Sequence, residues 1–224
     1  MYKYVKRTLD ILISLIILVV FGIPMLFIAL LIKIDSKGPV LFKQKRTGKD
    51  GKDFYLYKYR SMTVDNDVLN FNKANELTRV GKIIRKTSLD ELPQIINILK
   101  GDMSIIGPRP WIVEYYQNFT DDQKRRVEVL PGITGLAQCL GRNNISIFKK
   151  INYDIEYVDS ISLKTDLKIV FLTIKTVLSK SGAEQPKSGI QDELKDLERN
   201  YLFVTGSLPI IADDKDYEES KANA

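Results

Sequence analysis

A long apolar run dominates the N-terminal part of the chain. Residues 11–32 contain no charged side chain, and the run is as long as the roughly 20 residues that a helix needs to cross a bilayer. The run has no polar face, whereas a helix that packs on a protein core normally has one. It is also too long for a cleavable signal peptide, and no cleavage site of small residues follows before Lys33. The pattern therefore predicts a helix in the membrane.

Gly22 and Pro24 lie near the middle of this run, where a proline removes a backbone hydrogen bond and bends a helix. Basic residues flank the run on both sides. Because positively charged flanks stay on the cytoplasmic side, both ends are expected in the cytoplasm. A re-entrant helix, which enters and leaves the membrane through one face, satisfies both features; a straight span with a tolerated proline is the alternative. We expect residues 1–36 to form this re-entrant anchor, as two helices separated by a break at Pro24.

The pattern after the anchor is that of a small mixed domain. Residues 40–46 and 53–62 alternate aromatic and basic side chains on either side of an Asp-Gly turn at Asp50, which predicts a β-hairpin. Further on, Pro93 and Gly101 enclose a short apolar run. This arrangement predicts a helix that starts at the proline and is capped by the glycine.

The second half of the chain combines a glycine-rich stretch with a helical stripe. Residues 130–144 predict a loop or a tight crossover. Apolar residues then recur at helical spacing, with lysines on another side: Leu167, Val170, Phe171, Ile174, Val177 and Leu178, with Lys164, Lys168 and Lys175. This helix either packs on the core or lies at the lipid headgroups. Residues 183–224 form a C-terminal tail of unknown role that we expect to be partly disordered.

These elements predict an α+β fold that is mostly helical, with a re-entrant membrane helix at the N-terminus, a small β-hairpin and amphipathic interfacial helices. Residues 37–182 are expected to form one cytoplasmic domain, and a chain of 224 residues is long enough for such a domain to have its own core. The net charge of +6 and the isoelectric point near 9.2 favour anionic partners, such as nucleic acid, a phospholipid surface or a phosphorylated substrate.

The chain contains no histidine and a single cysteine, Cys139. Nucleophiles activated by histidine, and an imidazole base, are therefore excluded. An internal disulfide is excluded as well, and a zinc site would lack its usual ligands. Any metal ion should be a hard ion bound by oxygen atoms, such as Mg²⁺ or Mn²⁺.

Two adjacent carboxylates, Asp90 and Glu91, stand just ahead of the helix that is predicted to begin at Pro93. The N-terminus of a helix offers free N–H groups and a positive dipole end, which suits a phosphate. Helix capping is the plainer explanation, because Ser88 and Glu91 have the spacing of a capping box. The local sequence leaves both explanations open.

Six motifs stand in order along the chain: Lys6-Arg7, YKYRSM (residues 57–62), IRKTSLDELPQ (84–94), LKGDMSIIGPRP (99–110), LPGITGLAQ (130–138) and GRN (141–143). Together they resemble the bacterial sugar transferases, the monotopic phosphoglycosyl transferases, from about residue 3 to about residue 182. Members that consist of little more than the catalytic domain are the most similar, especially the enzyme that transfers bacillosamine phosphate in bacterial N-glycosylation.

This resemblance implies the transfer of a sugar-1-phosphate from a UDP-sugar to polyprenyl (undecaprenyl) phosphate, giving a polyprenyl diphospho-sugar and UMP, as the first membrane step of a surface glycan or glycoprotein pathway. Asp90 would be the catalytic nucleophile, forming an aspartyl-phosphosugar intermediate, and Glu91 would act beside it and hold Mg²⁺. The chemistry suits a chain without histidine, because a carboxylate needs no base to attack at pH 7.

The resemblance also implies the partners and the location. UDP-sugar, polyprenyl phosphate and anionic membrane lipids would bind, and nucleic acid would not. The protein would be monotopic, on the cytoplasmic face of the bacterial inner membrane, with residues 37–182 as the catalytic domain.

Further residues match positions near the active site of the family, and these candidate substrate-binding residues are Lys58, Arg85, Arg109, Arg142 and Asp166. For each arginine, a surface ion pair worth about 0–1 kcal/mol is the plainer explanation. The sequence departs from the family at Ile23, where a serine often precedes the proline and can bond a freed carbonyl. Cys139 and Leu140 stand where many members have Val-Asn.

Two other functions fit parts of the sequence. A membrane-anchored phosphohydrolase would use the same aspartate with water as the acceptor, and it would release free sugar phosphate. A membrane-tethered protein that binds nucleic acid or acts as an adaptor would use the basic charge and the hairpin. It would not depend on Asp90.

Overall fold

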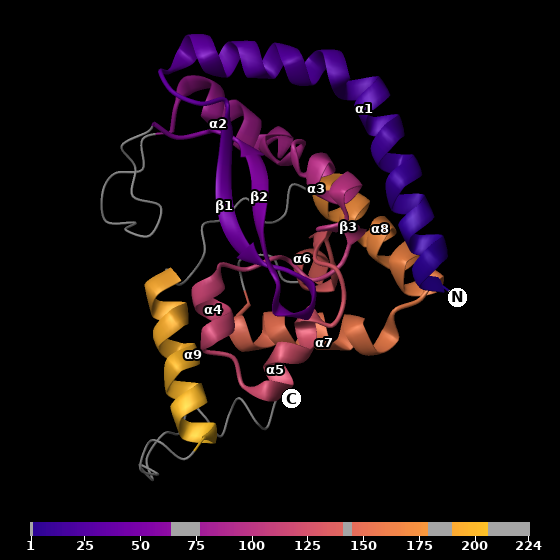
Figure 1. Cartoon of the computed structure of the whole chain (residues 1–224), viewed down its shortest axis with the longest axis vertical. Helices are drawn as coiled ribbons and strands as arrows, with labels where there is room; N and C mark the ends of the chain where they lie inside the picture. Colours follow the sequence, from indigo (N-terminus) through magenta and orange to yellow (C-terminus); the bar gives the residue numbers. More distant parts are fainter. Residues whose placement is uncertain (1, 64–76, 141–144, 179–189, 206–224) are drawn as a thin grey trace.

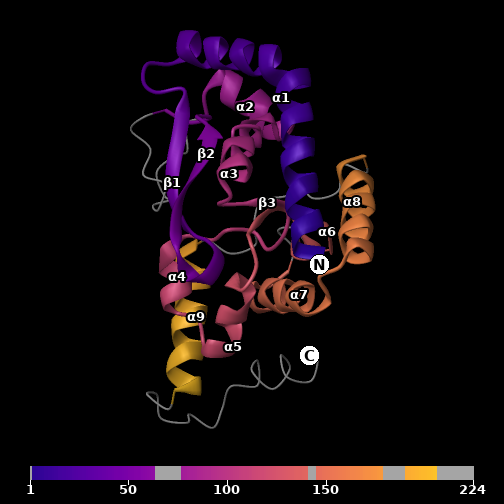
Figure 2. The ribbon, with the colours of Figure 1, turned by 45° about the vertical axis from the view of Figure 1, so that its right-hand side comes forward.

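The computed structural model describes residues 2–63, 77–140, 145–178 and 190–205. Within these ranges the chain is mostly helical, with two sheets of two strands each (Figure 1). A long bent helix, α1 (Tyr2–Asp35), forms an arch along one side, and the hairpin with the two α-helices that follow it in the chain lies on its concave side (Figure 2). The predicted α+β class with mostly helical content is confirmed.

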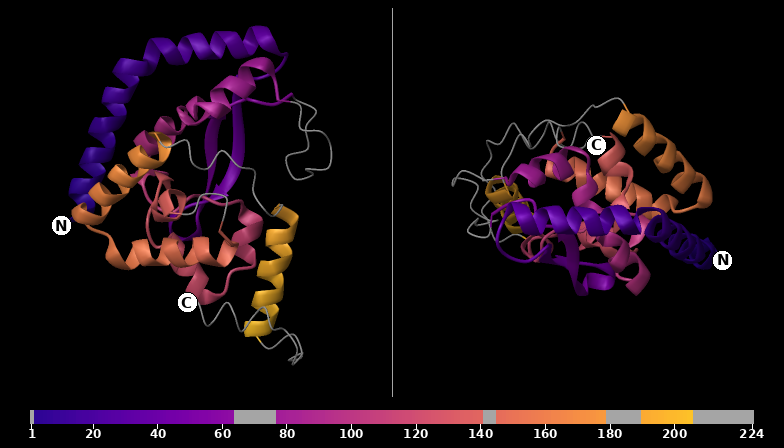
Figure 3. Two further views of the ribbon diagram at one scale, coloured as in Figure 1. Left: turned by 180° about the vertical axis from the view of Figure 1, so that it is seen from behind. Right: turned by 90° about the horizontal axis from the view of Figure 1, so that it is seen from above.

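Helix α1 contains the predicted apolar run and carries Pro24 inside it. The chain stays helical through the proline, where we expected a break, and it bends into two limbs (Figure 3). The proline explains the bend, because it lacks an N–H group and its ring clashes with the preceding turn. By length and composition α1 could cross a membrane, and only 6% of its most apolar 18-residue window is buried, unlike a core helix.

The predicted hairpin is confirmed. Strands β1 (Leu41–Thr47) and β2 (Asp53–Tyr59) pair antiparallel. The turn between them holds Asp50 and Gly51 at positive φ angles of 55° and 73°. Asp and Gly tolerate this left-handed backbone better than most residues, which is why the Asp-Gly pair predicted the turn.

The predicted short helix is also confirmed, as α3 (Gln94–Lys100), which ends at Gly101 with a φ of 94°. The buried Asn97 fastens this helix to β2: its side chain accepts a hydrogen bond from the N–H of Tyr57 (3.1 Å) and donates one to the carbonyl of Tyr55 (2.7 Å). Before α3 lie helix α2 (Arg79–Lys86) and the 3₁₀ turn η2 (Leu89–Glu91).

The structure corrects the prediction of a loop or crossover for residues 130–144. The described part of this stretch forms a strand parallel to β3 (Ser104–Ile106), followed by a helix: β4 (Gly132–Thr134) and α6 (Leu136–Leu140). A Cβ atom on Gly132 would lie 2.1 Å from the backbone nitrogen of Gly107. The glycines therefore allow two backbones to approach closely, and a strand of three residues is too short to show a periodic pattern.

Both limbs of α1 are held against this domain. Arg7, on the first limb, donates hydrogen bonds to the carbonyl oxygens of Ile98 (2.6 Å) and Leu99 (3.1 Å), at the C-terminal end of α3. The buried Asp10 accepts a hydrogen bond from the N–H of Ile105 (3.0 Å). Helix α1 is therefore bonded to both α3 and β3.

The second limb packs through Ile28 and Ile32, which share a buried cluster with Tyr59 of β2. The Tyr59 hydroxyl also donates a hydrogen bond to the carbonyl oxygen of Met25 (2.8 Å). This bond places a polar partner beside Pro24, where the sequence lacks the serine expected next to the proline.

Helices α7 (Ile147–Ser160) and α8 (Leu163–Leu178) follow, and α8 carries the predicted apolar stripe. Ile169 of α8 is buried in the core, but the stripe residues whose side chains the structure describes face outward: Leu167, Val170, Phe171 and Ile174, with Phe171 at 68% exposure. The explanation of this stripe as a core-facing surface is therefore wrong.

The predicted tail contains a packed helix, α9 (Ile190–Val204). Its Leu197 is completely buried against Tyr115 and Phe119, and its Glu193 accepts hydrogen bonds from the Tyr115 hydroxyl (2.7 Å) and from Lys150 (2.8 Å). Part of the tail is thus folded, and the expectation of partial disorder stays a prediction for the part that lies outside the described residues. The surface under α9 includes α4 (Val113–Gln117), which is followed by α5 (Asp121–Lys124) and the 3₁₀ turn η3 (Arg125–Val127).

Candidate active site

Asp90 and Glu91 lie in η2, immediately before α3. Ser88, which precedes this turn, has a left-handed backbone with a φ of 57° and makes no capping hydrogen bond with its side chain. The capping-box explanation is therefore wrong. A left-handed serine is strained by roughly 1 kcal/mol, and such strain is found mostly at functional sites.

Glu91 is the centre of a cluster of charges. Its Oε1 atom accepts hydrogen bonds from Lys58 Nζ (2.6 Å) and from Arg109 Nη2 (3.0 Å). Lys58 comes from β2, and Arg109 comes from the Pro-Arg-Pro segment after β3. Three segments distant in the sequence therefore meet at one carboxylate oxygen.

The two neighbouring carboxylates have opposite pKa shifts. Burial raises the pKa of Asp90 above its ordinary value, because the opposing effects of Lys58 and Arg85 are smaller. Burial also acts to raise the pKa of Glu91, but Arg109 and Lys58 outweigh it and hold this pKa at about 2. Paired carboxylates whose environments separate their pKa values are typical of sites where the two have different roles.

The pKa of Lys58, the lysine in this cluster, is shifted as well. Burial and the nearby Arg109 lower the pKa of Lys58, and the attraction of Glu91 only partly restores it. Lys58 and Arg109 thus repel each other while both are held by Glu91. An anion that binds between them would relieve this repulsion.

The site fits a hard metal ion better than a soft one. Both cations bind Oε1 of Glu91, and Oε2 has no bond to another described residue. Within the described ranges, no group of three or more Asp, Glu, Cys or His side chains could hold a metal ion. An ion here would need further ligands from substrate and water, and Mg²⁺ commonly binds in this way, with one or two carboxylates and substrate phosphates.

The structure unites some of the predicted site residues and separates one. Lys58 and Arg109 contact Glu91, while Arg85 lies at the end of α2 with an exposed side chain and acts on the charge of Asp90. Arg142 lies outside the described residues.

Asp166 is engaged elsewhere in the molecule. Its carboxylate accepts hydrogen bonds from the Tyr2 hydroxyl, from Lys6 (2.7 Å) and from the Tyr157 hydroxyl (2.8 Å). These bonds join the start of α1 to α7 and α8. The role of Asp166 in substrate binding stays a prediction.

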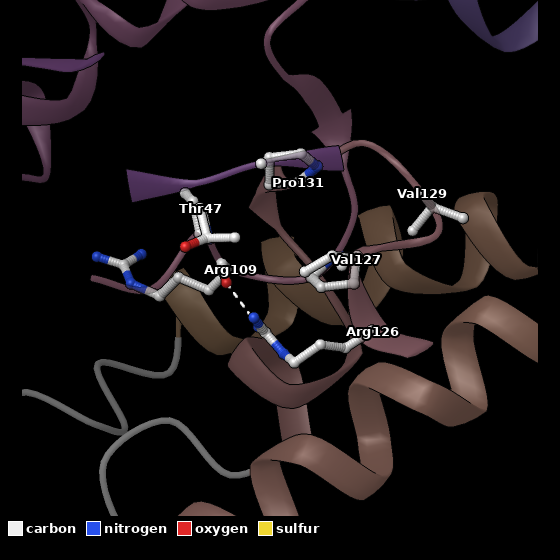
Figure 4. A pocket seen from close by; sticks show the side chains of 9 residues that line it. Thr47, Arg109, Arg126, Val127, Val129 and Pro131 are labelled. Carbon is white, nitrogen blue, oxygen red and sulfur yellow. Dashed lines mark hydrogen bonds between the residues drawn. The ribbon is translucent and has the colours of Figure 1, made fainter. Parts of the chain in front are cut away.

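Sequence reasoning missed Arg126, which is 2% exposed and binds the carbonyl oxygen of Arg109 (Figure 4). Arg126 follows Arg125, an exposed arginine, and nothing in the local sequence distinguishes the buried one. Figure 4 also shows a small pocket behind the Pro-Arg-Pro segment, from which the Arg109 guanidinium points away. The charged cluster around Glu91, and not this pocket, is the candidate active site.

The chain is similar to known proteins over most of its length. A family described as bacterial sugar transferase matches residues 1–180. The uncharacterized sugar transferase EpsL of Bacillus subtilis is 45% identical over 182 residues, which are 80% of this chain and 90% of that protein.

Two relatives are named for their reactions. The UDP-glucose:undecaprenyl-phosphate glucose-1-phosphate transferase of Klebsiella pneumoniae is 44% identical over 189 residues, 79% of this chain and 41% of that protein. The undecaprenyl-phosphate galactose phosphotransferase of Salmonella typhimurium is 38% identical over 200 residues, 81% of this chain and 42% of that protein. The chain thus spans less than half the length of these two relatives. From the match over residues 1–180, the chain belongs to the bacterial sugar transferase family of enzymes.

Proposed function

We propose that the protein transfers a sugar-1-phosphate from a UDP-sugar to undecaprenyl phosphate, giving undecaprenyl diphospho-sugar and UMP. The observation that carries this proposal is the Asp90–Glu91 pair with Lys58 and Arg109 on the same Glu91 oxygen. A buried carboxylate beside several cations suits a nucleophile that attacks a diphosphate. The names of the relatives support the same substrates, although they differ in the sugar.

The reaction proceeds in two steps, and in each step one bond to the β-phosphorus forms and another breaks. In the first, an oxygen of Asp90 forms a bond to the β-phosphorus, the bond from that phosphorus to the bridging oxygen breaks, and UMP leaves. In the second, a phosphate oxygen of undecaprenyl phosphate forms a bond to the same phosphorus and the bond to Asp90 breaks. Lys58, Arg85 and Arg109 provide positive charge for the phosphoryl oxygens.

We also propose that Mg²⁺ binds at Glu91. Lys58 and Arg109 both bond Oε1 of this residue, so Oε2 would be the atom that binds the ion. When bound, Mg²⁺ would supply positive charge that neutralises the diphosphate oxygens. Glu91 remains ionised for this role over the whole physiological pH range, because its pKa lies at about 2.

We propose further that the protein is bound to the membrane. Residues 1–36 form a re-entrant anchor with both ends on the cytoplasmic face, and residues 37–182 form the catalytic domain beneath it. The outward apolar stripe of α8, with its lysines, lies among the headgroups of anionic lipids. The supporting observations are the exposed apolar surfaces of α1 and α8 and the bend at Pro24.

The main test is Asp90→Asn, measured as UMP release from a panel of UDP-sugars with undecaprenyl phosphate. We expect turnover to be lost while the protein remains folded and membrane-bound, because an amide is a poor nucleophile. Asp121→Asn, on the exposed surface of α5, should leave turnover unchanged. Turnover of Asp90→Asn within about tenfold of the parent, or some 1.4 kcal/mol of barrier, would exclude Asp90 as the nucleophile. Free sugar phosphate among the products would indicate a hydrolase instead.

A second prediction concerns the metal ion. EDTA should stop turnover and Mg²⁺ should restore it, and Glu91→Gln should raise the Mg²⁺ concentration needed for half of the maximal rate. The control is Glu128→Gln, a glutamate of the η3 region that pairs with Arg125. Full activity of the metal-free enzyme would contradict the role given to Glu91.

A third prediction concerns pH. Asp90 must be ionised to attack, so kcat/KM should fall as the pH drops through its raised pKa. Lys58 lowers this pKa, and Lys58→Met should therefore move the acidic limb of the profile to higher pH. The control is Lys124→Met, which changes a lysine of α5 and should leave the acidic limb at the same pH. A limb that stays fixed or moves to lower pH in Lys58→Met would show that Lys58 does not act on Asp90.

A fourth prediction concerns topology. Single cysteines at Tyr4 and at Pro39, both exposed and uncharged, are introduced in a Cys139→Ser background. In intact spheroplasts both should resist an impermeant thiol reagent, and both should react once the membrane is opened. Reaction of the Tyr4→Cys protein alone before opening would establish a spanning helix and contradict the re-entrant anchor.

A further inference from the structure

Arg126 of η3 forms a buried ion pair with Asp154 of α7. The side chains of both residues are 2% exposed, and Arg126 donates to Asp154 Oδ2 through Nε (3.1 Å) and Nη2 (2.7 Å). A pair like this contributes little net stability compared with apolar residues of the same volume, because both charges lose their hydration. The ion pair is therefore better explained by a role other than stability.

The same guanidinium holds the backbone of the Pro-Arg-Pro segment. Its Nη2 atom donates to the carbonyl oxygen of Arg109 (2.7 Å), as Figure 4 shows, and its centre lies 4.2 Å from the centre of the Trp111 ring. These two contacts fall on either side of Pro110. Pro108 and Pro110 each hold their own φ at about −65°, and Pro110 also keeps the preceding Arg109 in an extended backbone conformation.

The side chain of Arg109 extends away from Arg126 to reach Glu91, at 3.0 Å. This side chain is 45% exposed, so few packing contacts restrain it. Its position depends on its bond to Glu91 and on where its backbone is fixed. Among the described residues, the Arg126 side chain bonds Asp154 and the Arg109 carbonyl but neither Glu91 nor Asp90, so it does not touch the site where the reaction is proposed to occur.

We propose that Arg126 is a positioning residue for Arg109, held in place by Asp154 and Trp111. This inference rests on the proposed function, in which Arg109 binds phosphoryl oxygens of the UDP-sugar. A planar guanidinium can bond a carboxylate and a carbonyl while stacking on an indole, and a lysine ammonium cannot do all three. Arg126→Lys should therefore keep the buried charge but release the Arg109 backbone.

The test is a double-mutant cycle of Arg126→Lys with Arg109→Met, measured as kcat/KM for UMP release and as Tm. With Arg109 present, Arg126→Lys should lower kcat/KM by about tenfold or more, since small displacements of a binding group cost this much. In the Arg109→Met background it should lower kcat/KM less than about twofold, because the residue that it positions is gone. The loss of Tm should be the same in both backgrounds.

The matched control is Arg125→Lys, which changes the neighbouring exposed arginine, paired with Asp159, and should alter neither quantity. Equal losses of kcat/KM in both backgrounds would overturn the inference and make Arg126 merely structural.

If Arg126→Lys does not fold, Trp111→Phe takes its place in the same cycle, with the same expected and contradicting results. If the parent releases no UMP, the proposed function fails, and the cycle is then measured by calorimetry as affinity for UMP, where coupling supports the inference and additivity overturns it.

Discussion

One carboxylate oxygen, Glu91 Oε1, accepts hydrogen bonds from both Lys58 and Arg109, and the candidate site depends on this shared contact. It joins the hairpin, the turn before α3 and the Pro-Arg-Pro segment. The charges are partly removed from water, so the loss of one partner would leave another charge poorly compensated. The same contact keeps two cations beside Asp90, whose own pKa is raised by burial.

Helix α3 connects this cluster to helix α1. Its N-terminal end follows the Asp90–Glu91 turn, and its C-terminal end receives the two hydrogen bonds of Arg7 from α1. Asn97, in the middle of α3, holds the hairpin strand that carries Lys58. A movement of α1 relative to the domain would therefore act on α3, and through α3 on the Asp90–Glu91 turn and on the strand of Lys58. Such coupling suits an enzyme whose proposed acceptor is a lipid.

A second layer of contacts lies behind Arg109. Arg126 and Trp111 fix the backbone from which this arginine extends, and the cluster around Phe119 is closed on its far side by α9. The family match ends at residue 180, so α9 is packed onto the domain from outside the matched region. It covers the surface that supports the Pro-Arg-Pro segment.

The sequence by itself determined the features that local chemistry controls. The Asp-Gly pair at Asp50 specified the hairpin turn, Pro93 and Gly101 marked the ends of α3, and the uncharged run of α1 required an apolar environment. The motifs around Asp90 identified the family. Only the tertiary structure decided which charges meet, because hydrogen bonds and burial join residues that are far apart in the chain. Local spacing suggested a capping box where the backbone is left-handed. It also could not distinguish the buried Arg126 from Arg125, since the partners that bury Arg126 lie elsewhere in the chain, with Arg109 17 positions away and Asp154 28 positions away.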